Sequence, residues 1–266
     1  MNKRVIVTRP LKEGRAWVQA FAAAGHEAIA FPLIEVAAAE DTLAVSRAWQ
    51  RLHDFDAVMF VSGNAVDYFF KDKPASALYL SEHSATNLRA YVTGPGSHAA
   101  LLRAQVPASL IDSPDLAAGQ FDSEALWAVV AEQVRPGWRV LIVRGASAAG
   151  APSDEGQGRD WFAGKVLAAG GTVEFVVAYR RRCPVFSAED RTLVKEAAND
   201  RSIWLLSSSE AVANLRSAFP LLSWSDGVAL ATHPRIAEAA RQAGFAVVYE
   251  SRPTLGDLLR SIESVQ

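Results

Sequence analysis

Small hydroxyl, amide and arginine side chains stand where apolar segments of this chain end. Ser62 and Asn64 follow the apolar run at 57–61, and Ser208 follows the one at 203–206. An amphipathic segment continues each run, a pattern that predicts a buried strand, a tight turn and a helix N-terminus. A helix N-terminus presents free backbone N–H groups to an anion. The two copies therefore predict a ligand with negative charge, held between two similar halves.

Other predicted strand ends carry the same residue types. The candidates are Thr8, Arg9, Ser62, Asn64, Thr93, Ser97, Arg144, Ser208, Ser209, Thr232 and Arg235. In open α/β sheets ligands bind beyond the carboxyl ends of the strands. Hydroxyl and guanidinium groups bind carboxylates and phosphates well. The set provides no pair of acids, no Ser–His–Asp order and no metal-ligand spacing, so we expect anion recognition and no metal site.

Each candidate also has a purely structural explanation. Ser62 and Ser208 suit the N-cap of a helix, a role worth about 1 kcal/mol each. Arg9 and Arg144 can be solvated charges at strand ends. Tyr179, at the end of another predicted strand, is of a type that often packs half-buried.

The elements that must position these residues occur twice. Arg4–Arg9 matches Arg139–Arg144, and Ala90–Gln105 matches Ala229–Gly244, like the two strand–turn–helix units above. Charged and aromatic residues align as well as apolar ones, which indicates a duplication. Alternating strands and helices predict a doubly wound parallel sheet in each half. Ala28–Val36 is predicted as one strand, in which Pro32 indicates an edge or a bend.

Composition excludes several classes of protein. The 266 residues are 50% hydrophobic, enough for one large or two ordinary domains. The 27 Lys and Arg nearly balance the 29 Asp and Glu, which argues against nucleic acid as a partner. A single cysteine, Cys183, excludes an internal disulfide framework. The opening residues predict a strand rather than a signal peptide, and no apolar run is long enough to cross a membrane. We therefore expect a soluble cytoplasmic protein.

A series of motifs extends over nearly the whole chain in order. They are VIVTRP (5–10), FVSGNAV (60–66), YVTGPGSHAAL (91–101), FDSEALW (121–127), VLIVRG (140–145), GRDWF (158–162), VVAYRR (176–181), LLSSSEAV (205–212) and ATHPRIAEAARQAGF (231–245). No single motif is diagnostic, but together the series resembles the uroporphyrinogen-III synthase family.

The resemblance implies two α/β lobes joined by a two-stranded linker, with the active cleft between them. It implies that residues 1–36 and 181–266 form one lobe and residues 37–180 the other, whereas the duplication alone would give consecutive halves. The implied reaction closes linear hydroxymethylbilane to uroporphyrinogen III, with loss of water and inversion of ring D. It uses no metal and no cofactor. Because the bilane closes unaided to the other isomer, the enzyme's main task is to fix a conformation.

The resemblance also assigns site residues. Tyr179, which ends VVAY, is the candidate to assist departure of the hydroxyl group. Ser62, Ser97, Ser208 and the turn before Ile236 are placed at the cleft. Position at strand ends or in the repeat adds Arg9, Asn64, Arg144, Arg159, Thr232 and Arg235.

Some expectations stay open at this point. The turn Thr232–Ala237 departs from the family pattern, and the loop Ala146–Gly158 is predicted to be a flap. A two-lobed module that binds anions without catalysis is one alternative. An NAD(P)-dependent reductase is a weaker one, since Gly94–Ala99 matches G-x-G-x-x-A but lacks a suitably placed acid, Asp112 lying in a proline-flanked segment. We expect a monomer, and transient contact with hydroxymethylbilane synthase is left open.

Overall fold

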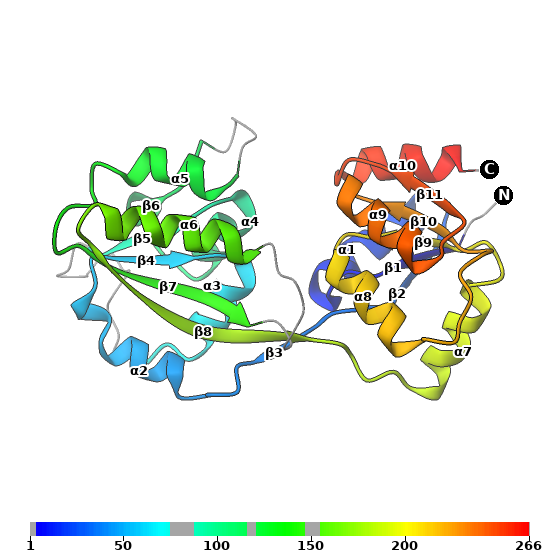
Figure 1. Ribbon diagram of the computed structural model, residues 1–266, viewed down its shortest axis with the longest axis horizontal. Helices are drawn as coiled ribbons and strands as arrows, with labels where there is room; N and C mark the ends of the chain where they lie inside the picture. The colour runs from blue at the N-terminus through cyan, green and yellow to red at the C-terminus, as the bar shows by residue number, and fades with distance from the viewer. Residues whose placement is uncertain (1–3, 75–87, 116–120, 147–154, 266) are drawn as a thin grey trace. The chain divides into compact units, whose positions relative to one another are not determined.

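The computed structural model describes residues 4–74, 88–115, 121–146 and 155–265, with only the backbone for 155–159. The chain divides into two units. Unit 1 consists of Met1–Glu35 and Arg182–Gln266, and unit 2 of Val36–Arg181. Figure 1 displays this discontinuity by colour, since unit 1 combines the blue start of the chain with its yellow-to-red end.

Unit 1 is built on a parallel sheet of five strands in the order β11-β10-β9-β1-β2. The strands are β1 (Arg4–Val7), β2 (Glu27–Ala30), β9 (Ile203–Leu206), β10 (Val228–Ala231) and β11 (Val247–Glu250). The helices are α1 (Leu11–Ala23), α7 (Ala188–Ala197), α8 (Ser209–Ala218), α9 (Pro234–Ala243) and α10 (Leu255–Ser264).

Helices cover both faces of this sheet. Side chains alternate between the faces of a strand, so Ile6 joins one apolar cluster and Val5 the other. The cluster around Ile6 includes Ile236 of α9, and the cluster around Val5 includes Phe21 of α1. Strands buried on both faces are nearly continuous apolar runs, as the sequence predicted for 203–206.

Unit 2 contains a sheet of six strands in the order β3-β8-β7-β4-β5-β6, parallel from β8 to β6. The strands are β3 (Glu35–Ala38), β4 (Ala57–Phe60), β5 (Arg89–Val92), β6 (Ile111–Asp112), β7 (Arg139–Ala146) and β8 (Thr172–Arg182). The helices are α2 (Ala44–Gln50), α3 (Gly63–Lys71), α4 (Pro95–Arg103), α5 (Ser123–Val130) and α6 (Glu155–Ala168), with short 3-10 turns at Leu52–Asp54 and Ala108–Leu110.

The chain passes between the units twice, within the neighbouring strands β3 and β8. Arg182 at the end of β8 donates hydrogen bonds of 2.9 and 2.6 Å to the Glu35 carboxylate at the start of β3. The predicted strand 28–36 is wrong as one element, because β2 ends at Ala30 and β3 starts at Glu35. Pro32 lies in the gap and has no N–H to donate to a neighbouring strand.

Five strands of the unit 2 sheet have the same spatial order as the five strands of unit 1. Reading unit 2 from β8 onward, the order β8-β7-β4-β5-β6 corresponds to β2-β1-β9-β10-β11 in unit 1. The sequence repeats fall on corresponding strands, β7 on β1, β4 on β9 and β5 on β10. The predicted α/β fold with a duplicated parallel sheet is therefore confirmed.

Candidate functional site

The central contact in unit 2 joins Tyr179 to Ser62. Tyr179, near the end of β8, is 2% exposed, and its hydroxyl lies 3.0 Å from Ser62 Oγ. Ser62 is the N-cap of α3, and its Oγ accepts a hydrogen bond of 3.1 Å from the Ala65 N–H. The hydroxyl of Ser62 thus caps the helix, as the structural explanation predicted, and also contacts the tyrosine.

A second aromatic ring holds Tyr179. The ring of Tyr68 in α3 stacks on it, with centroids 5.9 Å apart and an angle of 30° between the planes. The Tyr68 hydroxyl donates a 2.9 Å hydrogen bond to the carbonyl oxygen of Val36 in β3. Tyr179 is therefore fixed both at its ring and at its hydroxyl.

Two helix N-termini lie side by side next to Ser62. A Cβ added to Gly63 would lie 3.5 Å from the carbonyl oxygen of Gly96, which places the first turns of α3 and α4 in contact. Asn64 is in the first turn of α3, and Ser97, only 7% exposed, is in the first turn of α4. Adjacent first turns direct their free N–H groups into one region, which suits an anion.

The arginines predicted in unit 2 are less closely tied to this contact. The guanidinium of Arg144, in β7, stacks over the ring of Phe175 at 4.6 Å. Such a cation–π contact orients an arginine without a ligand. Arg159 belongs to α6, and its side chain lies outside the described part of the chain.

Arg9 is the most firmly held candidate in unit 1. Its guanidinium lies 4.5 Å from the ring centroid of Trp17, and its Nε donates a 3.3 Å hydrogen bond to Ser207 Oγ. The Glu13 carboxylate is 4.0 Å away. Sequence reasoning missed Trp17 and Ser207 as partners. No local pattern signals these contacts, because they depend on α1 starting at Leu11 and on β9 lying beside β1.

The other predicted residues of unit 1 surround the N-termini of α8 and α9. Ser208 is the N-cap of α8, and its side chain makes no capping bond to any described residue. The Thr232 N–H donates to the Leu206 carbonyl at 3.1 Å. His233 caps α9, because its Nδ1 accepts a 3.2 Å hydrogen bond from the backbone N–H of Arg235. Arg235 itself is exposed. The histidine in this turn thus has a capping role.

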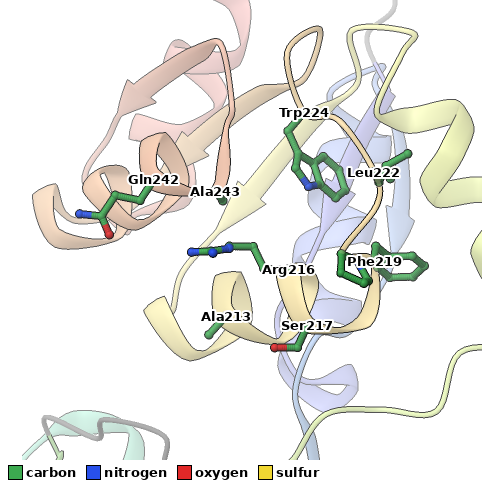
Figure 2. Close-up of a pocket in the computed structure, with 9 residues that line it drawn as sticks. Ala213, Arg216, Ser217, Phe219, Leu222, Trp224, Gln242 and Ala243 are labelled. Atoms are coloured by element: carbon green, nitrogen blue, oxygen red, sulfur yellow. The ribbon is translucent and has the colours of Figure 1, made fainter.

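A groove of about 500 Å³ in unit 1 lies elsewhere. Figure 2 shows Arg216, Phe219, Trp224 and Gln242 among its lining residues. It is formed by the C-terminal parts of α8 and α9, whereas the strand-end residues adjoin the N-termini of these helices. None of the described residues that line it is a predicted site residue, so the groove is separate from the candidate site.

The described ranges contain no group of three or more His, Cys, Asp or Glu side chains arranged to hold a metal ion. No helix within them has the length and apolar character needed to cross a membrane.

Comparisons with known proteins agree with one another. The family model described as uroporphyrinogen-III synthase HemD matches residues 15–260. The crystal structure of uroporphyrinogen-III synthetase from Helicobacter pylori has a TM-score of 0.57 and 14% identity, with 100% of both chains covered. A mutant uroporphyrinogen III synthase from Thermus thermophilus has a TM-score of 0.52 and 16% identity, with 99% of this chain and 98% of that chain covered.

At such identities the two structures show the fold. No curated protein matches the chain by sequence. The family model, in contrast, covers most of the chain and includes every described strand except β1. The chain therefore belongs to the uroporphyrinogen-III synthase family.

Proposed function

We propose that Tyr179, held in place by Ser62, is the catalytic residue with which this member of the family closes hydroxymethylbilane to uroporphyrinogen III. The family consists of cyclising hydro-lyases of tetrapyrrole biosynthesis, so the substrate is a tetrapyrrole. The observation that carries the proposal is the 3.0 Å contact between the two hydroxyls at the strand ends of unit 2.

The chemistry requires a proton donor and a fixed geometry. The C–O bond of the hydroxymethyl group breaks, and the oxygen leaves as water once it has gained a proton. The Tyr179 hydroxyl can donate a hydrogen bond to that oxygen, while Ser62 holds the phenol in place. Ring closure then needs the two ends of the bilane to be held together, a task of orientation rather than of strong nucleophiles.

Carboxylates on the substrate supply the negative charge for which the strand ends are suited. In unit 2 the first turns of α3 and α4, with Asn64 and Ser97, provide N–H and polar groups. In unit 1 the corresponding groups come from α8 and α9, together with Arg9, Ser208, Thr232 and Arg235. We assign these residues to binding, and the catalytic step to Tyr179 alone.

The family assignment disfavours the two alternatives that the sequence left open. The chain matches a family of cyclising enzymes over most of its length, which favours catalysis over a module that only binds anions. The reductase alternative required an acid for a dinucleotide ribose. Asp112, at the end of β6, instead accepts hydrogen bonds of 2.7 and 2.8 Å from the Arg89 guanidinium.

An isomer assay tests the proposal. Freshly generated hydroxymethylbilane is supplied, the products are oxidised, and uroporphyrins I and III are separated by chromatography. We expect predominantly type III with the wild-type protein, and a lower rate with Tyr179→Phe at unchanged substrate binding. Type I alone, formed at the uncatalysed rate, would overturn the proposed activity.

We further propose that the enzyme acts in the cytoplasm as a monomer. The instability of the bilane favours a short path from the enzyme that makes it, which supports transient contact with hydroxymethylbilane synthase. Light scattering measures the mass in solution. In an assay that couples the two enzymes, an excess of inactive hydroxymethylbilane synthase should compete for the contact and lower the rate of type III formation.

A further inference from the structure

We propose that Gly145 is a positioning residue for Tyr179, because any side chain at position 145 would prevent the tyrosine hydroxyl from reaching Ser62. The inference rests on the proposed role of Tyr179. It assigns a function to a glycine of β7 that lies in none of the predicted binding sets.

The strand order imposes the need for such a residue. Tyr179 belongs to β8 and Ser62 follows β4, while β7 lies between these two strands. Neighbouring strands are about 4.8 Å apart. The tyrosine side chain must therefore pass over the backbone of β7 to place its hydroxyl 3.0 Å from Ser62 Oγ.

Gly145 lies where the ring crosses. A Cβ at this position would be 2.4 Å from Cζ, 2.5 Å from Cε2 and 2.8 Å from Cε1 of Tyr179. Favourable contacts between carbon atoms occur at about 3.5–4.0 Å. The backbone of Gly145 is not in the left-handed region, so glycine is required here by space and not by conformation.

An irregularity in the strand pairing aligns the two residues. Arg144 pairs with Val177, but Gly145 pairs with Tyr179, so Ala178 is passed over. A bulge of this kind re-aims the side chain that follows it. Here the bulge places Tyr179 opposite Gly145, the glycine of β7.

The remaining contacts limit other positions of the ring. Tyr68 stacks on Tyr179, and its own hydroxyl is held by the Val36 carbonyl. A ring displaced from Gly145 would have to disturb this stacking as well as the contact with Ser62. Misplacement by about 1 Å is enough to cost about 100-fold in rate when a catalytic group acts by orientation.

The first test is Gly145→Ala, with Gly164→Ala as its control. Gly164 lies in α6, and no described atom would come within 4 Å of an added Cβ. We expect Gly145→Ala to lower kcat about 10- to 100-fold, to change KM little and to reduce the share of type III product. Gly164→Ala should leave kcat unchanged. Wild-type kcat in a folded Gly145→Ala protein would overturn the inference.

A cycle with Tyr179→Phe separates positioning from general damage. Phenylalanine keeps the ring but has no hydroxyl, so Gly145→Ala should lower Tm in both backgrounds but lower kcat only where the tyrosine is present. An equal fold-loss of kcat in the two backgrounds would show that Gly145 acts by another route. Wild-type kcat in Tyr179→Phe itself would instead refute the proposed role of the tyrosine, a distinct outcome.

Tyr179→Leu covers the case in which Gly145→Ala does not fold. Leucine has none of the three ring atoms that an added Cβ would meet. The double variant Gly145→Ala/Tyr179→Leu should therefore have the same Tm as Tyr179→Leu alone. A further drop in Tm on adding Gly145→Ala would contradict the proposed packing.

Discussion

The two sheets share a strand order and differ in what their corresponding strands carry. β8 of unit 2 continues to Tyr179 and on to Arg182, whereas β2 of unit 1 ends at Ala30, before Pro32. Both sheets place helix N-termini beyond the strand ends, but only unit 2 adds a buried phenol among the described residues. The comparison teaches that anion recognition can be common to both copies, while the proposed proton donor arose in one.

The largest loss of activity should come from removing the Tyr179 hydroxyl of β8, which has no counterpart in β2. Tyr179→Phe keeps the ring packed against Tyr68 and removes the hydroxyl at Ser62. A positioned acid contributes about 100-fold or more to rate, so we expect a loss of that order in kcat with little change in Tm. The assay is the rate of type III formation.

Tyr249→Phe is the matched control for that substitution. Tyr249 lies in β11 of unit 1, outside the predicted site. Its substitution should leave both rate and isomer ratio unchanged. Equal losses in the two variants would remove the distinction drawn between the units.

The paired serines should give the next largest effect. Ser62 caps α3 through its hydroxyl, whereas Ser208 makes no described capping bond in α8. Ser62→Ala should therefore lower the free energy of unfolding by about 1 kcal/mol and also lower kcat, since the contact to Tyr179 is lost. Ser208→Ala should have a smaller effect on urea unfolding.

Ser62→Thr serves as the conservative variant. It retains a hydroxyl at the N-cap and should recover most of the kcat lost in Ser62→Ala. If Ser208→Ala proved as destabilising as Ser62→Ala, the two caps would be equivalent and the comparison would fail at this position.

Arg9 tests binding in unit 1. Its guanidinium is oriented by Trp17 and Ser207, as expected for a preformed anion contact. Hydrogen bonds to charged groups contribute about 1.5–3 kcal/mol, so Arg9→Ala should raise KM about 10-fold or more, with a smaller change in kcat. Salt should weaken wild-type binding more than it weakens binding by the variant.

Arg216→Ala is the control for Arg9→Ala. Arg216 is an exposed arginine of the same unit, in the groove of Figure 2 and away from the strand ends. Its removal should not change KM. An equal rise in KM for both variants would indicate a general effect of positive charge rather than a site at Arg9.

Local patterns were sufficient to predict the strand ends but not the contacts across the sheet. Ser62 and Ser208 could be placed because an apolar run, a small polar turn and an amphipathic helix are all local features. The role of Gly145 could not be predicted, because it depends on pairing with β8 and on a one-residue irregularity in that pairing. Short β6 was missed for a related reason, since two residues in a proline-flanked segment have no periodicity.

Other expectations stay as they were. The flap predicted at Ala146–Gly158 lies largely outside the described residues, as residues 147–154 are not described. The predicted cleft and the boundaries at 36 and 181 remain predictions. The stacking of Arg144 on Phe175 could not be predicted from a local pattern, because Phe175 belongs to the neighbouring strand β8.

The smallest effect at neutral pH is expected from Tyr91 in β5, a buried residue whose counterpart in unit 1 is Leu230 in β10. Desolvation by burial, reinforced by the Asp112 carboxylate, raises the pKa of Tyr91 above its ordinary value of 10.0. The neutral phenol is thus favoured in the folded state, where it donates a 2.9 Å hydrogen bond to Gln133 Oε1. Its contribution to stability is complete below pH 10 and is lost as pH rises from there toward the raised pKa.

Leu230 is fully buried and cannot ionise, so at this pair of positions alkaline conditions should destabilise unit 2 but not unit 1. Hydrogen exchange at pH values on either side of 10 would follow the two sheets separately, because buried strands exchange through the opening of their own unit. Tyr91→Phe should reduce the dependence of unit 2 on alkaline pH, with some loss of stability at neutral pH from the missing hydrogen bond to Gln133. If unit 2 of the variant remained as sensitive to alkaline pH as that of the wild type, ionisation of this tyrosine would not be the source of the difference between the two sheets.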